Sequence, residues 1–164
     1  MKKKFIIIYL LYLSIITGYI FINIYTPQKD TVSTQVYYID SDMLRLIPTD
    51  LTVAEKKPQK QAEIIISKLI DGKDNVKKIK RMIPKNPACM SVQVNFNTAI
   101  VDIKRADEFP DGRVAEGLVV YQIVNSLTSI EGIDEVKFTI NGETSRDFKG
   151  FMDMRETYIP YDYV

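Results

Sequence analysis

The chain begins with an apolar segment that is long enough to cross a membrane. Residues 5–25 are twenty-one consecutive residues without a charge, and Lys2, Lys3 and Lys4 precede them directly. A helix of this length reaches roughly 30 Å, the thickness of the hydrocarbon core of a bilayer. Because a helix satisfies its own backbone hydrogen bonds, such a segment can lie in lipid. Residues 1–25 are therefore predicted to be a transmembrane signal-anchor.

The charges around this segment predict its orientation. Three lysines precede it, whereas Lys29 and Asp30 after it roughly cancel. Lysine-rich flanks stay in the cytoplasm, so we expect the chain from about Thr26 onward to lie outside the cytoplasmic membrane. The alternative is a signal peptide cleaved near Gly18, which would give a secreted protein. The uncleaved anchor is favoured, because cleavage there leaves a hydrophobic new N-terminus and no Ala-x-Ala pattern is present.

Cys89 is the only cysteine in the chain. It lies far from the apolar segment, so it cannot be the attachment site of a lipoprotein, and it cannot form an intramolecular disulfide. The domain must therefore be stabilised by its core alone. In the alternation of the following strand, Cys89 falls on the polar side with Ser91 and Gln93, which predicts a half-exposed thiol at a sheet edge.

The charge of the remaining chain argues against a nucleic-acid partner. The chain has 22 Lys and Arg and 21 Asp and Glu, and the three N-terminal lysines leave 19 bases against 21 acids, a net charge of −2. Nucleic-acid binding needs clustered cations that displace phosphate counterions. The one basic cluster lies in a connecting stretch and is interpreted as a solvated loop (Lys73, Lys77, Lys78, Lys80, Arg81).

Residues 34–164 are predicted to form one domain after a short polar spacer at residues 26–33. Alternating and helical patterns predict the order strand-strand-helix-strand-strand-helix-strand. The expected strands are 35–39, 43–47, 90–96, 99–104 and 136–140, and the expected helices are 58–71 and 114–130.

Turn and cap residues predict the boundaries of the two helices. Pro58 suits the first turn of the first helix, where its missing N–H is not needed, and Gly72 follows its end. Asp111 is the candidate N-cap of the second helix, and Gly132 is its C-terminal stop. The second helix is apolar on nearly every side, so we expect it to be the more buried one. Its only polar strip is Gln122, Asn125, Ser126 and Ser129.

Each predicted strand has one apolar and one polar face, and each helix has a broad apolar side. These patterns predict an α+β fold, a two-layer sandwich in which both helices cover one face of a mixed β-sheet. The other face of the sheet is expected to be solvated (Arg45, Gln93, Asn95, Asp102, Lys137, Thr139).

The residues needed for most enzyme chemistry are missing. The chain has no histidine, which removes the usual general base, and one cysteine alone cannot bind zinc. Asp40 and Asp42 are interpreted as turn residues in preference to a calcium site. Glu116 is the most interesting acid, but its position in the first turn of a helix beside Arg113 indicates a structural role. We therefore predict no catalytic, cofactor-binding or metal site and no enzyme activity.

Residues 125–142, with further segments in the matching order along the chain, resemble the GerMN domain of sporulation and spore germination proteins. The closing signature of that family is an apolar helix, a glycine stop, a Val-x-Phe strand and an Asn-Gly turn, which residues 125–142 resemble. Further segments agree with the opening strand, the first helix, the next strand entry and the tail of the family (37–40, 62–72, 83–84, 150–155).

The resemblance implies a membrane-attached extracytoplasmic domain without catalytic residues. Its fold is expected to be similar to the ring-building modules of secretion and sporulation machines. On this reading the chain is a protein-interaction or scaffold module of a sporulation or germination envelope assembly. Its expected partners are other envelope or sporulation proteins, including further copies of itself.

Two other functions remain as alternatives. A peptidoglycan- or glycan-binding protein is the first, because Tyr158, Tyr161 and Tyr163 crowd the C-terminal tail and can form aromatic platforms. A spore-wall hydrolase is the second, less favoured alternative. It would combine Glu116 with Glu131 or Glu143 and needs two acids that converge within about 5–10 Å.

Overall fold

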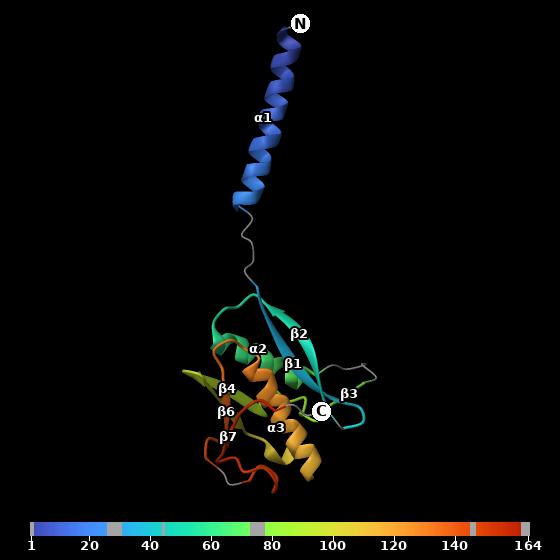
Figure 1. Ribbon diagram of the computed structural model, residues 1–164, viewed down its shortest axis with the longest axis vertical. Coiled ribbons are helices and arrows are strands. Elements are labelled where there is room, and N and C mark those ends of the chain that lie inside the picture. Colours follow the sequence, from blue (N-terminus) through green and yellow to red (C-terminus); the bar gives the residue numbers. More distant parts are fainter. Residues whose placement is uncertain (1, 26–30, 44, 73–77, 145–146, 162–164) are drawn as a thin grey trace. The chain divides into compact units, whose positions relative to one another are not determined.

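The computed structural model describes residues 2–25, 31–43, 45–72, 78–144 and 147–161. Two compact units are present, Met1–Asp30 and Thr31–Val164. In the described residues the first unit is helix α1, and the second is an α+β domain that contains every strand (Figure 1). Residues 26–30 of the expected spacer lie outside the described residues, and Val32 and Ser33 already belong to the first strand.

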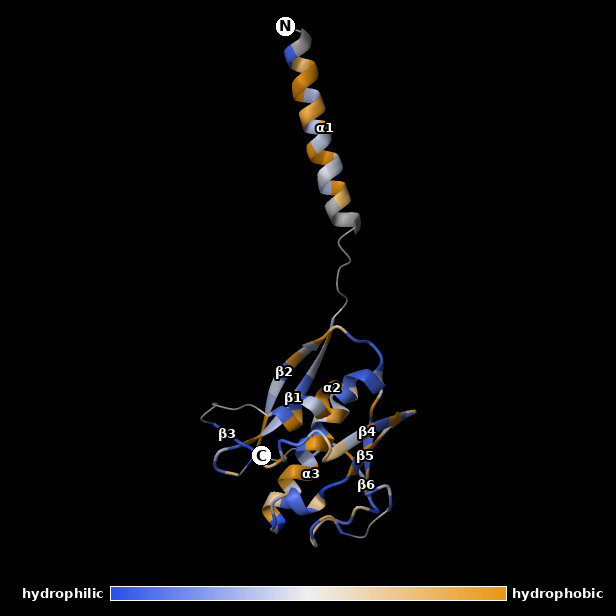
Figure 2. Cartoon of the chain, turned by 180° about the vertical axis from the view of Figure 1, so that it is seen from behind, coloured by the Kyte–Doolittle hydropathy of each residue, from blue (hydrophilic) through white to orange (hydrophobic). Residues whose placement is uncertain are grey.

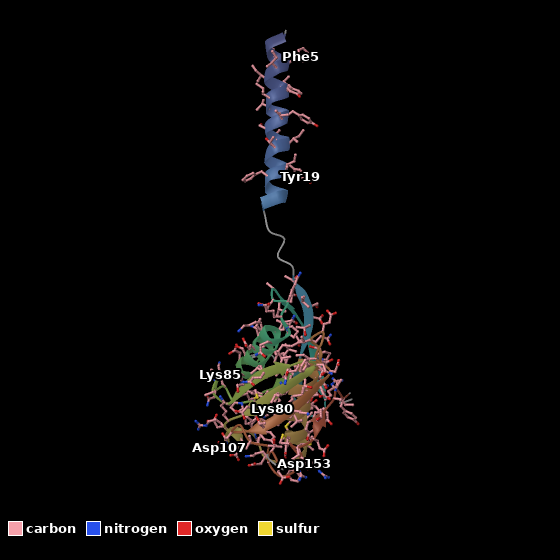
Figure 3. All side chains as sticks on the ribbon, turned by 90° about the vertical axis from the view of Figure 1, so that its left-hand side faces the viewer. Phe5, Tyr19, Lys80, Lys85, Asp107 and Asp153 are labelled. Atoms are coloured by element: carbon pink, nitrogen blue, oxygen red, sulfur yellow. The ribbon has the colours of Figure 1, made fainter. Side chains whose placement is uncertain are left out.

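Helix α1 (Lys2–Tyr25) has no polar face. Hydrophobic residues recur along it between weakly polar ones, after a hydrophilic start (Figure 2), and side chains project outward on every side (Figure 3). The hydroxyls of Ser14 and Thr17 are satisfied within the helix, since Ser14 donates to the Leu11 carbonyl at 2.8 Å and Thr17 donates to the Leu13 carbonyl at 3.0 Å. The helix is thus long and apolar enough to cross a membrane, a property that signal sequences share.

The first sheet has three strands in the order β2-β1-β3. β1 (Val32–Asp40) and β2 (Leu46–Val53) form an antiparallel hairpin, as predicted. The second strand was expected at 43–47 but begins only at Leu46, because Met43 belongs to the turn, with a positive φ of 57°. β3 (Ile79–Lys80) pairs only with Ile39 and Asp40 at the end of β1. Among the described residues, the first half of β1 therefore has a strand neighbour on one side only.

The second sheet has four strands in the order β4-β5-β6-β7. β4 (Met90–Asn95) and β5 (Thr98–Ile103) form an antiparallel hairpin, and β6 (Glu135–Ile140) runs parallel to β5. β7 (Thr157–Tyr158) completes the sheet, antiparallel to β6. The parallel pair makes this sheet mixed, as predicted from the sequence.

The outer face of the second sheet is polar, as expected. Asp102 accepts hydrogen bonds there from the Thr139 hydroxyl at 2.9 Å and the Gly142 N–H at 2.7 Å. Gln93 and Lys137 are exposed on the same face. Arg45, which was expected there, lies instead between β1 and β2 in the other sheet, where its Nε is 3.5 Å from Asp40.

Helix α2 (Pro58–Asp71) begins at Pro58 and ends before Gly72, as predicted. Helix α3 (Arg113–Thr128) follows a single turn of 3₁₀ helix, η1 (Ala106–Glu108). The prediction that Asp111 caps α3 is wrong. Gly112 occupies the N-cap position with φ of 110°, which leaves the Asp111 side chain outside the helix, 2.9 Å from Lys149 Nζ.

The core lies where the two helices meet both sheets. α2 contacts β4 and β1, and α3 contacts β1 and β6 (Figure 1). α3 is the more buried helix, as expected from its apolar surface. The largest fully buried side chains come from both sheets, both helices and the connecting loops, and they include Phe138, Ile39, Ile65, Ile83, Leu118 and Ile123.

The structure confirms the α+β class and the order of the main elements. The patterns did not predict that the strands divide between two sheets. Polar side chains of α2 bond to the free edge of β4, and polar side chains of α3 bond to the free edge of β1. A single continuous sheet would need a further strand at these edges, so the two sheets stay separate. The candidate site lies beside one of these contacts, along the edge of β4.

Candidate functional site

Glu116 is a structural anchor for the C-terminal tail. Its side chain is fully buried and its carboxylate accepts three backbone N–H groups. Lys149 and Met152 donate to Oε1 at 3.0 and 2.7 Å, and Phe151 donates to Oε2 at 3.1 Å. Hydrogen bonds to a charged acceptor are stronger than bonds between neutral groups. The expected structural role is thus supported, but through the tail and not through Arg113, which is exposed.

The other acids considered from the sequence lie apart from any built site. Glu131 and Glu143 are exposed, whereas Glu116 is buried with both oxygens bonded to backbone N–H groups. Asp40 closes the β1–β2 turn by accepting the Arg45 N–H at 3.4 Å, and Asp42 is exposed. Among the described residues, no group of three or more His, Cys, Asp or Glu is placed to hold a metal ion.

The polar strip of α3 bonds to the free edge of β1. Ser126 Oγ accepts the Tyr37 N–H at 2.9 Å. Ser129 Oγ accepts the Gln35 N–H at 3.1 Å and lies 2.8 Å from the Gln35 carbonyl, to which its hydroxyl can donate. It is also 2.7 Å from the Thr34 hydroxyl. Two serine hydroxyls thus bond to backbone groups of β1 that would otherwise pair with a neighbouring strand.

Asn125, in the same strip, fastens the end of the tail. Its Nδ2 donates to the Tyr161 carbonyl at 2.8 Å, and its Oδ1 accepts the Tyr161 N–H at 3.0 Å. A side-chain amide therefore reproduces the paired bonds of a β-bridge. Together with Glu116, it holds the tail against both ends of α3.

The tyrosines of the tail are part of the packing. Tyr158 is 8% exposed and donates to the Asp153 carbonyl at 2.9 Å. Its ring packs edge-to-face on Phe138, and Tyr121 contacts both Tyr158 and Tyr161. Burial raises the pKa of Tyr158 to about 12. Of the three residues considered for an aromatic platform, Tyr163 lies outside the described residues, and Tyr158 is unavailable to a glycan.

Cys89 is fully buried, so the prediction of a half-exposed thiol is wrong. The residue precedes β4 in a bend, where its N–H donates to the Asn86 carbonyl at 2.9 Å, so strand alternation does not extend to it. Burial, with Glu108 nearby, raises the pKa of the thiol. A buried, protonated thiol is a poor nucleophile.

β4 is the edge strand of the second sheet, and its free edge faces α2. Lys104 N–H donates to the Cys89 carbonyl at 2.8 Å, so these two residues form a bonded pair. Bonded and non-bonded pairs alternate along an antiparallel ladder. The N–H and C=O groups of Met90, Val92 and Val94 therefore point away from β5.

Gln59 of α2 bonds to the C-terminal part of this edge, at Val92 and Val94. The Val94 N–H donates to Gln59 Oε1 at 2.7 Å, and Gln59 Nε2 donates to the Val92 carbonyl at 3.1 Å. Nε2 also donates to Glu63 Oε1 at 2.9 Å, which fixes the orientation of the amide. A glutamine side chain thus takes the place of a neighbouring strand at Val92 and Val94.

An open groove of about 370 Å³ runs beside the N-terminal part of the edge, at Met90 and Val92. Its walls are Ile66, Ser67 and Ile70 of α2 on one side and Pro87, Met90 and Val92 on the other. In the described part of the chain, the N–H and C=O of Met90 and the N–H of Val92 have no hydrogen-bond partner. Their residues are nevertheless only 4% and 8% exposed. Because poorly solvated backbone groups are almost always paired, this groove is the candidate binding site.

Sequence reasoning did not find this groove. The alternation of β4 and the apolar face of α2 were both recognised, but each was assigned wholly to the core. The available signal was Gln59, a polar residue one position after Pro58 on the helix turn that faces the strand.

The fold is a small α+β domain with an open groove between α2 and β4, preceded in sequence by an apolar helix. Residues 35–146 match the Germane family, which is described as "Sporulation and spore germination". The chain belongs to this family, in agreement with the GerMN resemblance. The family description names a process and no reaction. No curated protein matches the chain.

Solved structures agree with the fold. The tandem GerMN domains of the sporulation protein GerM from Bacillus subtilis are 23% identical, with a TM-score of 0.56 over 76% of this chain and 44% of that one. The first GerMN domain alone is 20% identical, with a TM-score of 0.51 over 75% and 92%. A putative lipoprotein from Clostridium perfringens is 14% identical, with a TM-score of 0.52 over 80% and 89%. The chain thus spans less than half of the tandem structure.

Proposed function

We propose that this chain is a membrane-anchored, extracytoplasmic domain that binds protein partners in an envelope assembly of sporulation or spore germination. The unpaired stretch of the β4 edge within an apolar groove carries this proposal, because it is a binding feature that the domain itself does not fill. The family and the apolar helix α1 support the process and the anchor. The lysines at its start support an outward-facing domain.

The acids support an interaction role over a hydrolytic one. Both carboxylate oxygens of Glu116 accept hydrogen bonds from backbone N–H groups of the tail, three in all. Glu131 and Glu143 are solvated surface residues. A hydrolase would instead need two acids that face one substrate.

Photocrosslinking in sporulating cells tests the proposal. The crosslinker benzoylphenylalanine replaces either Ser67 in the groove wall or Glu131 on a distant loop of the full-length chain; both residues are exposed. We expect discrete crosslinked complexes from the Ser67 position and few from Glu131. A strictly monomeric pattern at both positions would contradict the interaction function.

A pull-down with purified cell wall separates the glycan-binding alternative. The proposed function predicts that the full-length chain, solubilised in detergent, stays in the supernatant. Retention on the wall that Tyr161→Ala abolishes would favour the peptidoglycan-binding alternative, since Tyr161 is 59% exposed.

A further inference from the structure

The open part of the β4 edge also indicates the kind of partner. We propose that the groove between α2 and β4 binds an extended polypeptide segment, which adds to β4 as a short strand and presents a basic residue to Asp71. This inference rests on the proposed function, that the domain binds protein partners, and specifies how one of them is recognised.

The unpaired backbone groups determine the class of ligand. Met90 offers an N–H and a C=O in the same direction, and Val92 offers a further N–H two residues along. A neighbouring polypeptide in extended conformation supplies acceptors and donors at this spacing, which is how strand addition to a sheet edge works. The Gln59 amide already pairs with the edge in this way, because it satisfies the next two groups, the Val92 carbonyl and the Val94 N–H.

The length of the groove sets the length of the segment. Gln59 lies beside Val92 and Val94, so α2 and β4 run in opposite directions and Asp71 lies at the end of the groove away from Gln59. Glu63 and Asp71 are eight residues apart on α2, about 12 Å along the helix axis. At roughly 3.3 Å per residue, this distance holds about four extended residues.

The walls predict the side chains of the segment. Ile66, Ile70 and Met90 form an apolar surface that suits one or two aliphatic side chains of alternate residues. Glu63, at one end, is already paired with Lys60 Nζ at 2.7 Å. Asp71, at the other end, is exposed, and no ion pair in the described part of the chain involves its carboxylate. The Arg81 guanidinium lies at this end as well, but it donates to the backbone carbonyls of Ile70 and Asp71. The Asp71 carboxylate is therefore the position assigned to a partner lysine or arginine.

Binding of synthetic peptides to the full-length chain in detergent micelles tests this inference. The probe is acetyl-Thr-Val-Thr-Val-Lys-amide, together with a version that carries lysine at the first position. A matched control of each has N-methylated valines, which removes backbone donors and keeps the side chains. The two versions cover the two possible strand directions, so we expect the one whose lysine reaches Asp71 to bind and to shift the Met90 and Val92 amide signals in NMR spectra. Its N-methylated control should bind at least tenfold more weakly.

Variants of the groove sharpen the test. Ser67→Arg fills the groove from an exposed position and should abolish binding, whereas Lys68→Gln, one residue along, should not change it. Asp71→Asn should weaken the lysine peptide and leave a glutamine-substituted peptide unchanged. Gln59→Ala frees the Val92 carbonyl and the Val94 N–H, so a peptide two residues longer should gain affinity.

Equal binding of a peptide and its N-methylated control, or no binding by either version, would overturn strand addition. Such a result alongside crosslinks from the Ser67 position would reject this inference and leave the proposed function standing. Absence of those crosslinks in cells would reject the proposed function itself.

Discussion

Replacing Glu116 with glutamine is expected to lower the free energy of unfolding by about 3 kcal/mol, and the melting temperature by roughly 10 °C. The buried carboxylate accepts backbone N–H groups of Lys149, Phe151 and Met152. Glutamine keeps the shape of the side chain but places an amino group against at least one of these donors. A buried donor without an acceptor is destabilising by about 1–3 kcal/mol, and the charge-assisted bonds are lost as well.

Thermal and urea denaturation of the full-length chain in detergent measure this effect. Glu131→Gln is the matched control, because Glu131 is exposed, and its unfolding free energy should stay within about 0.5 kcal/mol of the wild type. Hydrogen exchange should be faster at the amides of Lys149, Phe151 and Met152 in Glu116→Gln. An unchanged melting temperature combined with loss of a spore-wall hydrolase activity would instead assign Glu116 a catalytic role.

The double substitution Ser126→Ala and Ser129→Ala is expected to destabilise the domain by about 3–4 kcal/mol. The two hydroxyls bond to the backbone of Tyr37 and Gln35 at the free edge of β1. Alanine removes the hydrogen-bond partners of these backbone groups on the edge of β1 that faces α3. Each single substitution should account for about 2 kcal/mol.

Ser91→Ala is the matched control for the double variant, because Ser91 is exposed on the polar face of the second sheet. Its unfolding free energy should remain within about 0.5 kcal/mol of the wild type. If the double variant were as stable as this control, the two serines would not substitute for a strand. The explanation for the division into two sheets would then fail.

Local patterns predicted most of the elements. Strand alternation located β1, β4, β5 and β6, because each of these strands has one face against the core. Pro58 and Gly72 located both ends of α2, since proline and glycine act through backbone geometry that does not depend on the rest of the fold. The Asn141-Gly142 turn was recognised for the same reason, and both residues have positive φ.

The remaining features depend on contacts between distant parts of the chain. β3 and β7 are two residues long and carry no periodic signal. The pairing of α3 with β1 joins residues that are 89–95 positions apart in the sequence. The role of Glu116 depends on a tail 33–36 residues away, and the groove depends on Gln59 meeting a strand 33–35 residues away. Such contacts follow from tertiary packing, which local patterns do not specify.

Cysteine labelling of intact protoplasts tests the central claim most directly, because the claim needs the domain to lie outside the membrane on an uncleaved helix. Glu131→Cys places a thiol at an exposed position, whereas the native Cys89 is buried and should stay unlabelled until the protein is denatured. The account predicts that a membrane-impermeant maleimide labels Glu131→Cys in intact protoplasts, on a membrane-bound chain of full length. A Lys3→Cys control should be labelled only after lysis. Labelling of Glu131→Cys only after lysis, or of a shortened chain in the medium, would contradict the account.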